Sequence, residues 1–109
     1  MKKIYLFCDA GMSTSMMAQR MQEVADKNNL PFEIKAFGTR LLPAKLEEGL
    51  DCVLLGPQVR HTLDRTEELA KPYKVPVGVL DSEDYGLMDG ERALKKTILM
   101  MKKHKQENK

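Results

Sequence analysis

The organisation of this chain follows from Ile4-Tyr5-Leu6-Phe7-Cys8-Asp9-Ala10-Gly11-Met12-Ser13-Thr14-Ser15. An apolar run ends at Phe7, a turn of small and hydroxylated residues follows, and a helix-period pattern begins near Met16. The turn therefore joins a strand to a helix, and its backbone N–H groups should converge just beyond the Cys8 sulfur, at the positive end of that helix. This pattern predicts a thiolate that takes up a phosphoryl group.

Composition restricts the kind of protein. The 109 residues suffice for one domain with a core, and the formal net charge is +2. Basic residues alternate with acidic ones except at the C-terminal end, so we expect no nucleic-acid partner. No apolar run approaches the roughly 18 residues of a membrane-spanning helix, and the run after Met1-Lys2-Lys3 is too interrupted for a signal peptide. We therefore expect a cytoplasmic protein without membrane insertion, in which Cys8 and Cys52 are reduced thiols.

The pattern along the chain predicts alternating strands and helices. Strands are expected at 3–7, 32–36, 52–55 and 75–80, and helices at 16–27, 42–48, 59–70 and 90–103, with a polar loop at 81–89. Residues 1–103 then form the domain, and residues 104–109 form a polar tail that should fray.

Such alternation predicts an α/β fold with one four-stranded parallel sheet and helices on both faces. We expect the strand order 2-1-3-4, with the site at the carboxyl ends of strands one and three. This rule brings together the loop 8–15, the turn 56–58 and the loop 81–89. Because Pro76 cannot donate a ladder hydrogen bond, the fourth strand should begin irregularly or lie at an edge.

The residues of the first loop have separate predicted roles. The helix N-terminus should favour the thiolate form of Cys8, whereas Cys52 lies within an apolar run and is expected to be a buried small hydrophobe. Gly11 allows the backbone to approach an anion closely. The hydroxyls of residues 13 to 15 can donate to phosphate oxygens or cap the helix.

An absent arginine separates two kinds of chemistry. A cysteine-dependent low-molecular-weight phosphatase of this topology has an arginine where Thr14 stands, and its guanidinium clamps the phosphate oxygens in the transition state. Without it, the loop can hold a phosphocysteine but is poorly equipped to hydrolyse it. An arsenate reductase would also need further cysteines. A regulatory module that has lost transfer is a third alternative, against which the intact Cys8 and hydroxyls argue.

The chain resembles enzyme IIB of the bacterial sugar phosphotransferase system, lactose/cellobiose (chitobiose) family, over nearly its whole length. The resemblance rests on the loop Cys8 to Ser15, on Leu54-Leu55-Gly56-Pro57-Gln58, and on Asp81 with Tyr85-Gly86 and Asp89-Gly90. It implies a sheet of the low-molecular-weight tyrosine phosphatase topology. It also implies that Cys8 accepts a phosphoryl group from phosphohistidine of a cognate IIA protein and passes it to a sugar bound by the membrane permease IIC.

Two residues depart from the family pattern. Asp9 stands where a small or neutral residue is usual, and we expect its carboxylate to point toward solvent because a neighbouring thiolate would repel it. His61 stands where an aromatic residue is usual. It is either a surface histidine or a donor behind the phosphoryl group.

Two other residues are expected behind the thiol. Gln58 is predicted to fix the loop by bonding to its backbone, and Asp81 to cap or brace the last loop. Lys95 and Lys96 are interpreted as part of a solvated helix face. Phosphoryl transfer of this kind requires no cofactor, and the sequence contains no tight cluster with the spacing of metal ligands.

Overall fold

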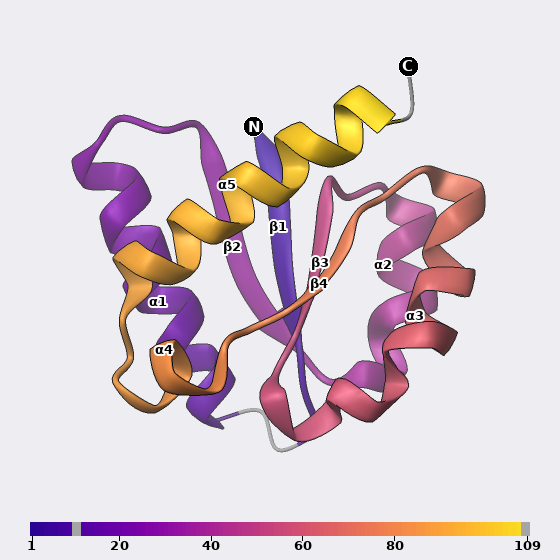
Figure 1. Cartoon of the computed structure of the whole chain (residues 1–109), viewed down its shortest axis with the longest axis horizontal. Helices are drawn as coiled ribbons and strands as arrows, with labels where there is room; N and C mark the ends of the chain where they lie inside the picture. The colour runs from indigo at the N-terminus through magenta and orange to yellow at the C-terminus, as the bar shows by residue number, and fades with distance from the viewer. Residues whose placement is uncertain (10–11, 108–109) are drawn as a thin grey trace.

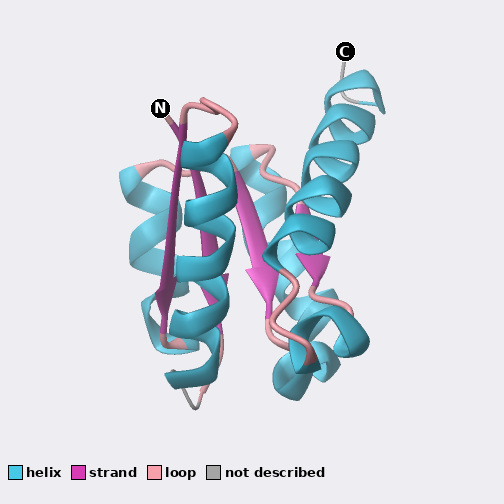
Figure 2. Cartoon of the chain, turned by 90° about the vertical axis from the view of Figure 1, so that its left-hand side faces the viewer, coloured by secondary structure: helices cyan, strands magenta, loops and turns pink. Residues whose placement is uncertain are grey.

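A computed structural model describes residues 1–9 and 12–107 (Figures 1 and 2). Strands and helices alternate along the chain. In order they are β1 Lys2–Phe7, α1 Met12–Lys27, β2 Phe32–Phe37, η1 Thr39–Leu41, α2 Leu42–Glu48, β3 Cys52–Leu55, η2 Pro57–Thr62, α3 Leu63–Ala70, η3 Lys71–Tyr73, β4 Val77–Val79, α4 Ser82–Gly86 and α5 Gly90–Glu107, where η marks a 3-10 helix.

The four strands form one parallel sheet in the order β2-β1-β3-β4. This confirms the predicted fold class and strand order, and β4 is an edge strand as Pro76 suggested. In Figure 2 the strand arrows point the same way, toward the end of the molecule where β1 ends at Phe7. The loops after β1, β3 and β4 therefore begin at one edge of the sheet.

The central strand β1 is buried on both of its faces. Its side chains alternate, so that Ile4 and Leu6 join one core while Tyr5 and Phe7 join the other. The first core is completed by α1 and α5, and the second by α2 and α3, which lie on opposite sides of the strands in Figure 1. Burial on both faces explains why residues 4–7 of β1 and the whole of β3 are continuous apolar runs.

Several predicted boundaries were wrong, each for a local reason. Helix α1 begins at Met12, not near Met16, because hydroxylated residues are well tolerated in a first helical turn. The predicted helix 59–70 starts as the 3-10 helix η2, and α3 itself begins at Leu63. Leu69, near the end of α3, is 39% exposed.

The C-terminal third also differs from expectation. The predicted polar loop 81–89 contains the short helix α4 at Ser82–Gly86, and Asp81 caps it. Strand β4 is confined to Val77–Val79. Helix α5 continues to Glu107, beyond the predicted end at residue 103, because its last residues are strong helix formers despite their polarity.

One glycine determines how closely α5 approaches α1. A Cβ atom on Gly90 would lie 2.7 Å from the backbone carbonyl carbon of Arg20 and 2.8 Å from its oxygen. Backbone atoms cannot move aside as the end of a flexible side chain can. The first turn of α5 can therefore meet α1 only because residue 90 has no side chain.

We predict that Gly90→Ala destabilises the fold by about 1–3 kcal/mol, the usual cost of overpacking. Thermal unfolding followed by circular dichroism should show a midpoint lower by roughly 5–15 °C, at about 5 °C for each kcal/mol. Gly86→Ala is the matched control, because a Cβ atom at Gly86 meets nothing within 4 Å. Equal melting midpoints for Gly90→Ala and wild type would contradict this account of the α1–α5 contact.

Candidate functional site

Cys8 lies where the two central strands end. Its backbone N–H donates to the carbonyl oxygen of Phe37 at 3.1 Å, which holds it against the end of β2. The N–H of Gly56, just beyond β3, donates to the carbonyl oxygen of Phe7 at 2.9 Å. Cys8 is only 1% exposed, so the position of its sulfur is determined by both neighbouring strands.

The thiol has a specific polar neighbour in Gln58. The Cys8 Sγ donates to Gln58 Oε1 at 3.5 Å, within the range for a hydrogen bond that involves sulfur. Gln58 is exposed at the start of η2. The Gln58 amide therefore meets the sulfur itself. Its predicted bond to loop backbone stays a prediction, because Ala10 and Gly11 lie outside the described residues.

Gly56 provides the space in which the thiol and the amide meet. A Cβ atom on this residue would lie 3.2 Å from Cys8 Sγ and 3.0 Å from Gln58 Oε1. Sequence reasoning noticed Gly56 only as part of a turn and missed this role. The signal was a glycine directly between a buried strand and Pro57-Gln58.

The predicted phosphate loop is described in part. Ala10 and Gly11 lie outside the described residues, and Met12 is the first residue of α1. Ser13 and Ser15 are exposed in the first turn of this helix. The amino end of α1 therefore follows Cys8 within four residues and carries the partial positive charge of a helix N-terminus.

Thr14 behaves differently from the two serines. Its side chain is fully buried, and its hydroxyl forms a hydrogen bond with the Tyr85 hydroxyl at 3.1 Å. Tyr85 belongs to α4 and is 8% exposed. This hydroxyl pair links the first turn of α1 to α4, a connection between distant segments that sequence reasoning did not foresee.

Asp9 points away from the interior. Its exposed carboxylate accepts a hydrogen bond from Thr39 Oγ1 at 2.5 Å, so it is tied to η1. The solvent exposure agrees with the expectation from charge repulsion. His61 is also exposed, in η2.

Asp81 anchors the third loop. Its Oδ1 accepts from the backbone N–H of Glu83 at 2.9 Å and of Asp84 at 3.1 Å, which caps α4. These backbone hydrogen bonds, that of Asp84 first, and the nearby Lys96 hold the pKa of the Asp81 carboxyl below its usual value. The predicted capping role matches this geometry.

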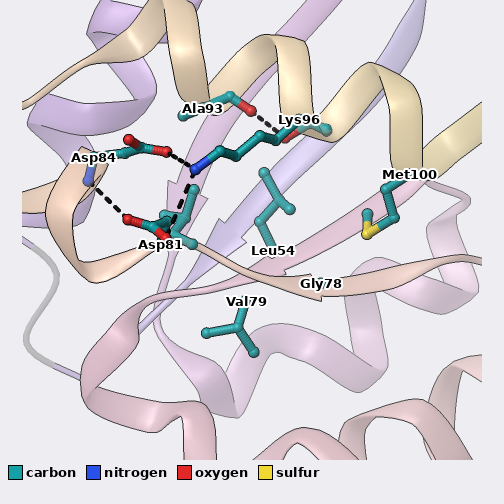
Figure 3. A pocket seen from close by; sticks show the side chains of 10 residues that line it. Leu54, Gly78, Val79, Asp81, Asp84, Ala93, Lys96 and Met100 are labelled. Carbon is teal, nitrogen blue, oxygen red and sulfur yellow. Dashed lines mark hydrogen bonds and ion pairs between the residues drawn. The ribbon is translucent and has the colours of Figure 1, made fainter.

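A buried carboxylate completes the anchor and was missed. Asp84 is 1% exposed, and Lys96 Nζ donates to its Oδ2 at 2.7 Å while also lying 3.6 Å from Asp81 Oδ2 (Figure 3). Arg92 Nε lies 3.3 Å from Asp84 Oδ1. The hydrogen bond with Asp84, more than any other cause, raises the pKa of Lys96, so Lys96 is not merely part of a solvated helix face.

This anchor lies beside a cavity of about 250 Å³ between β4 and α5 (Figure 3). Leu54, Gly78, Ala93 and Met100 form much of its apolar lining. Neither Cys8 nor Gln58 lines it. The cavity is therefore separate from the thiol. The charged side chains beside it, Asp81, Asp84 and Lys96, hold α4 in place.

We predict that the capping contribution of Asp81 depends on pH. Its lowered pKa means that the stabilisation is complete above the ordinary aspartate value of about 3.9 and is lost as pH falls through the lower folded value. Asp81→Ala should lower the urea midpoint at pH 7, and this difference from wild type should shrink toward pH 2.

Asp81→Asn is the matched variant, because an amide oxygen can still cap the helix but does not titrate in this range. The difference in urea midpoint between Asp81→Asn and wild type should also shrink toward pH 2. At pH 7 this difference should be smaller than the one for Asp81→Ala. A pH-independent deficit in Asp81→Ala would show that the carboxylate charge has no part in bracing α4.

Comparison with known proteins shows the family. Residues 3–96 match the family model "PTS system, Lactose/Cellobiose specific IIB subunit". The oligo-beta-mannoside-specific EIIB component of Bacillus subtilis (strain 168) is 35% identical over 101 residues, which cover 93% of this chain and 97% of that protein.

Two solved structures of IIB components are also similar to this chain. The solution structure of a cellobiose-specific phosphotransferase IIB component from Borrelia burgdorferi is 37% identical, covers 94% of both chains and has a TM-score of 0.74. The lactose-specific IIB component domain from Streptococcus pneumoniae, at 15% identity, shows the same fold with a TM-score of 0.82 and covers 91% of this chain and 96% of that one. The chain therefore belongs to the lactose/cellobiose-specific IIB subunits of the phosphotransferase system, which are components in the transfer of a phosphoryl group to sugar.

Proposed function

We propose that Cys8 is the residue that carries the phosphoryl group, as S-phosphocysteine. The observation that carries this proposal is the place of its sulfur, at the carboxyl end of β1, in contact with the Gln58 amide and followed by the amino end of α1. Cys52 offers no such setting, because it is fully buried within β3 and burial raises the pKa of its thiol.

The transfer occurs in two steps that balance in atoms and charge. In the first, the Cys8 thiolate attacks phosphorus of a phosphohistidine on the cognate IIA protein, the S–P bond forms and the N–P bond breaks. The thiol proton is taken up by the released imidazole. In the second, a hydroxyl of the saccharide bound by the IIC permease attacks phosphorus. The sulfur leaves with the S–P electron pair and is protonated by the proton that the hydroxyl gives up.

The loop from Asp9 to Ser15 binds the phosphoryl oxygens, chiefly through backbone N–H groups. Support comes from the amino end of α1, which carries the partial positive charge of a helix N-terminus, and from the exposed hydroxyl of Ser13. Positioning and electrostatic stabilisation of this kind are the main requirements of phosphoryl transfer. Gln58 acts at the sulfur, and Asp81 acts through α4, which it caps. His61 acts from η2, behind the groups that bind the phosphoryl oxygens.

Thr14 supports a carrier over a phosphatase. It stands where a phosphatase has its clamping arginine, and its hydroxyl is buried against Tyr85. Without a guanidinium in the loop, attack by water on phosphocysteine lacks its usual stabilisation, so the group persists until the sugar receives it.

The remaining expectations concern where the domain works. Residues 1–103 contain every group assigned to transfer, and residues 104–109 are dispensable for it. The domain acts at the cytoplasmic side of the membrane, held there through the permease. Among the described residues, no helix is long and apolar enough to cross a membrane.

We predict that incubation with phosphoenolpyruvate, enzyme I, the histidine carrier protein and cognate IIA adds one phosphoryl group to the wild type. Mass spectrometry should place it on Cys8. Cys8→Ser should acquire no thiophosphate, and Cys52→Ala is the matched control that should label normally. The carrier function is refuted if Cys8→Ser retains a label of the same position and stability, or if the wild type hydrolyses an aryl phosphate as fast as a phosphatase.

A further inference from the structure

The contact between Cys8 and Gln58 raises a chemical problem. The sulfur donates its only proton to Gln58 Oε1 at 3.5 Å. Once the thiol ionises or is phosphorylated, no proton remains on the sulfur, and the amide oxygen would present its lone pairs to a negative group. Such a contact is repulsive, so the resting arrangement cannot persist through transfer.

A carboxamide can resolve this without leaving the site. It has an acceptor and a donor group of nearly the same shape, and half a turn about its last side-chain bond exchanges them. Gln58 is exposed, so solvent can satisfy whichever group faces outward. Two other described residues beside the sulfur offer no such side chain, because Gly56 has none and the Asp9 carboxylate is held by Thr39 Oγ1.

We propose that the Gln58 amide remains with the Cys8 sulfur through the transfer cycle and changes from acceptor to donor. Its oxygen accepts the S–H proton of the resting thiol. After rotation, its N–H group donates to the thiolate and then to an oxygen of the phosphoryl group. This inference rests on the proposed function of Cys8 and adds that Gln58 touches the reacting atoms.

Gly56 is the residue that makes this contact possible. Its backbone has φ −63° and ψ 153°, an extended conformation that any residue adopts without strain. A Cβ atom there would nevertheless lie 3.2 Å from Cys8 Sγ, 3.3 Å from Cys8 Cβ and 3.0 Å from Gln58 Oε1. Gly56→Ala therefore acts by crowding the sulfur and the amide, with no effect on backbone strain.

The test measures the rate of Cys8 alkylation by iodoacetamide against pH, which reports thiolate formation and needs no phosphoryl donor. Both thiols are buried, so every variant is made in the Cys52→Ala background, where alkylation reports Cys8 alone. Asp9 is the titratable neighbour in sequence, and because it is unchanged in every variant its effect is common to all of them.

We expect the pH midpoint of alkylation to rise in three variants. Gln58→Met removes the donor to the thiolate at similar side-chain volume, and Gly56→Ala displaces it. Gln58→Glu places a carboxylate beside the sulfur and should raise the midpoint most, by about one pH unit or more. Phosphoryl uptake from IIA by Gln58→Met should be roughly tenfold slower, as expected for a lost hydrogen bond to a charged group.

Two matched controls separate this contact from general effects. Gln106→Met makes the same exchange on an exposed residue in the last turn of α5. The C-terminal end of α5 lies at the opposite end of the molecule from η2 (Figure 1). Gly38→Ala places a Cβ atom no nearer than 4.0 Å, to the Cys8 carbonyl oxygen, with an extended backbone at φ −70°. Both should keep the wild-type midpoint.

If Gln58→Met keeps the wild-type pH midpoint of alkylation, the proposal is wrong. This holds even if Gln58→Glu raises the midpoint, because any carboxylate placed near the sulfur would raise it. If the Gln58 variants shift as expected but wild-type Cys8 is never phosphorylated, the amide contact stands and the carrier function fails. The two claims are therefore tested separately.

Discussion

The site depends on the pairing of β1 with β3. Both strands are buried on both faces, and their register places Phe7 opposite Leu55, so the two strands end together. The hydrogen bond from Gly56 N–H to the Phe7 carbonyl oxygen extends the ladder by one residue. A slip by a single residue would reverse which core each side chain enters, so burial specifies the register strongly. Cys8, Gly56 and Gln58 meet because of that register.

Burial also explains which parts of the fold could be predicted from the sequence. The apolar runs of β1 and β3 and the alternation of strands with helices were sufficient for the sheet order and for the edge at which Cys8 lies. Helix α4 could not be predicted, because a single aromatic side chain among its five residues gives no apolar period. The helix exists through its Asp81 cap and the buried Asp84. The start of α1 was missed because hydroxylated residues are equally compatible with a loop and with a first helical turn.

The place of Cys8 in the fold was predictable, and its contacts were less so. A cysteine between a strand and a helix N-terminus was sufficient to single out Cys8. The partner of Gln58 was not predictable, because a glutamine after a strand can reach backbone or side chain with equal ease, and the choice follows from the space left by Gly56. The Thr14–Tyr85 pair joins residues 71 positions apart, a separation over which no local pattern has information. The ion pairs of Asp84 with Lys96 and Arg92 could not be predicted either, because the sequence does not distinguish a buried aspartate from an exposed one.

The central claim is that phosphorus is bonded to the Cys8 sulfur and that the surrounding groups hold it there without hydrolysing it. The ³¹P NMR spectrum of the protein phosphorylated by its IIA protein tests this most directly, because sulfur-bound and nitrogen-bound phosphorus resonate in different regions. The account predicts one resonance of a thiophosphate monoester, which is absent in Cys8→Ser and persists while no sugar-loaded permease is added. A resonance typical of a phosphohistidine, or one that decays at once to inorganic phosphate, would contradict it.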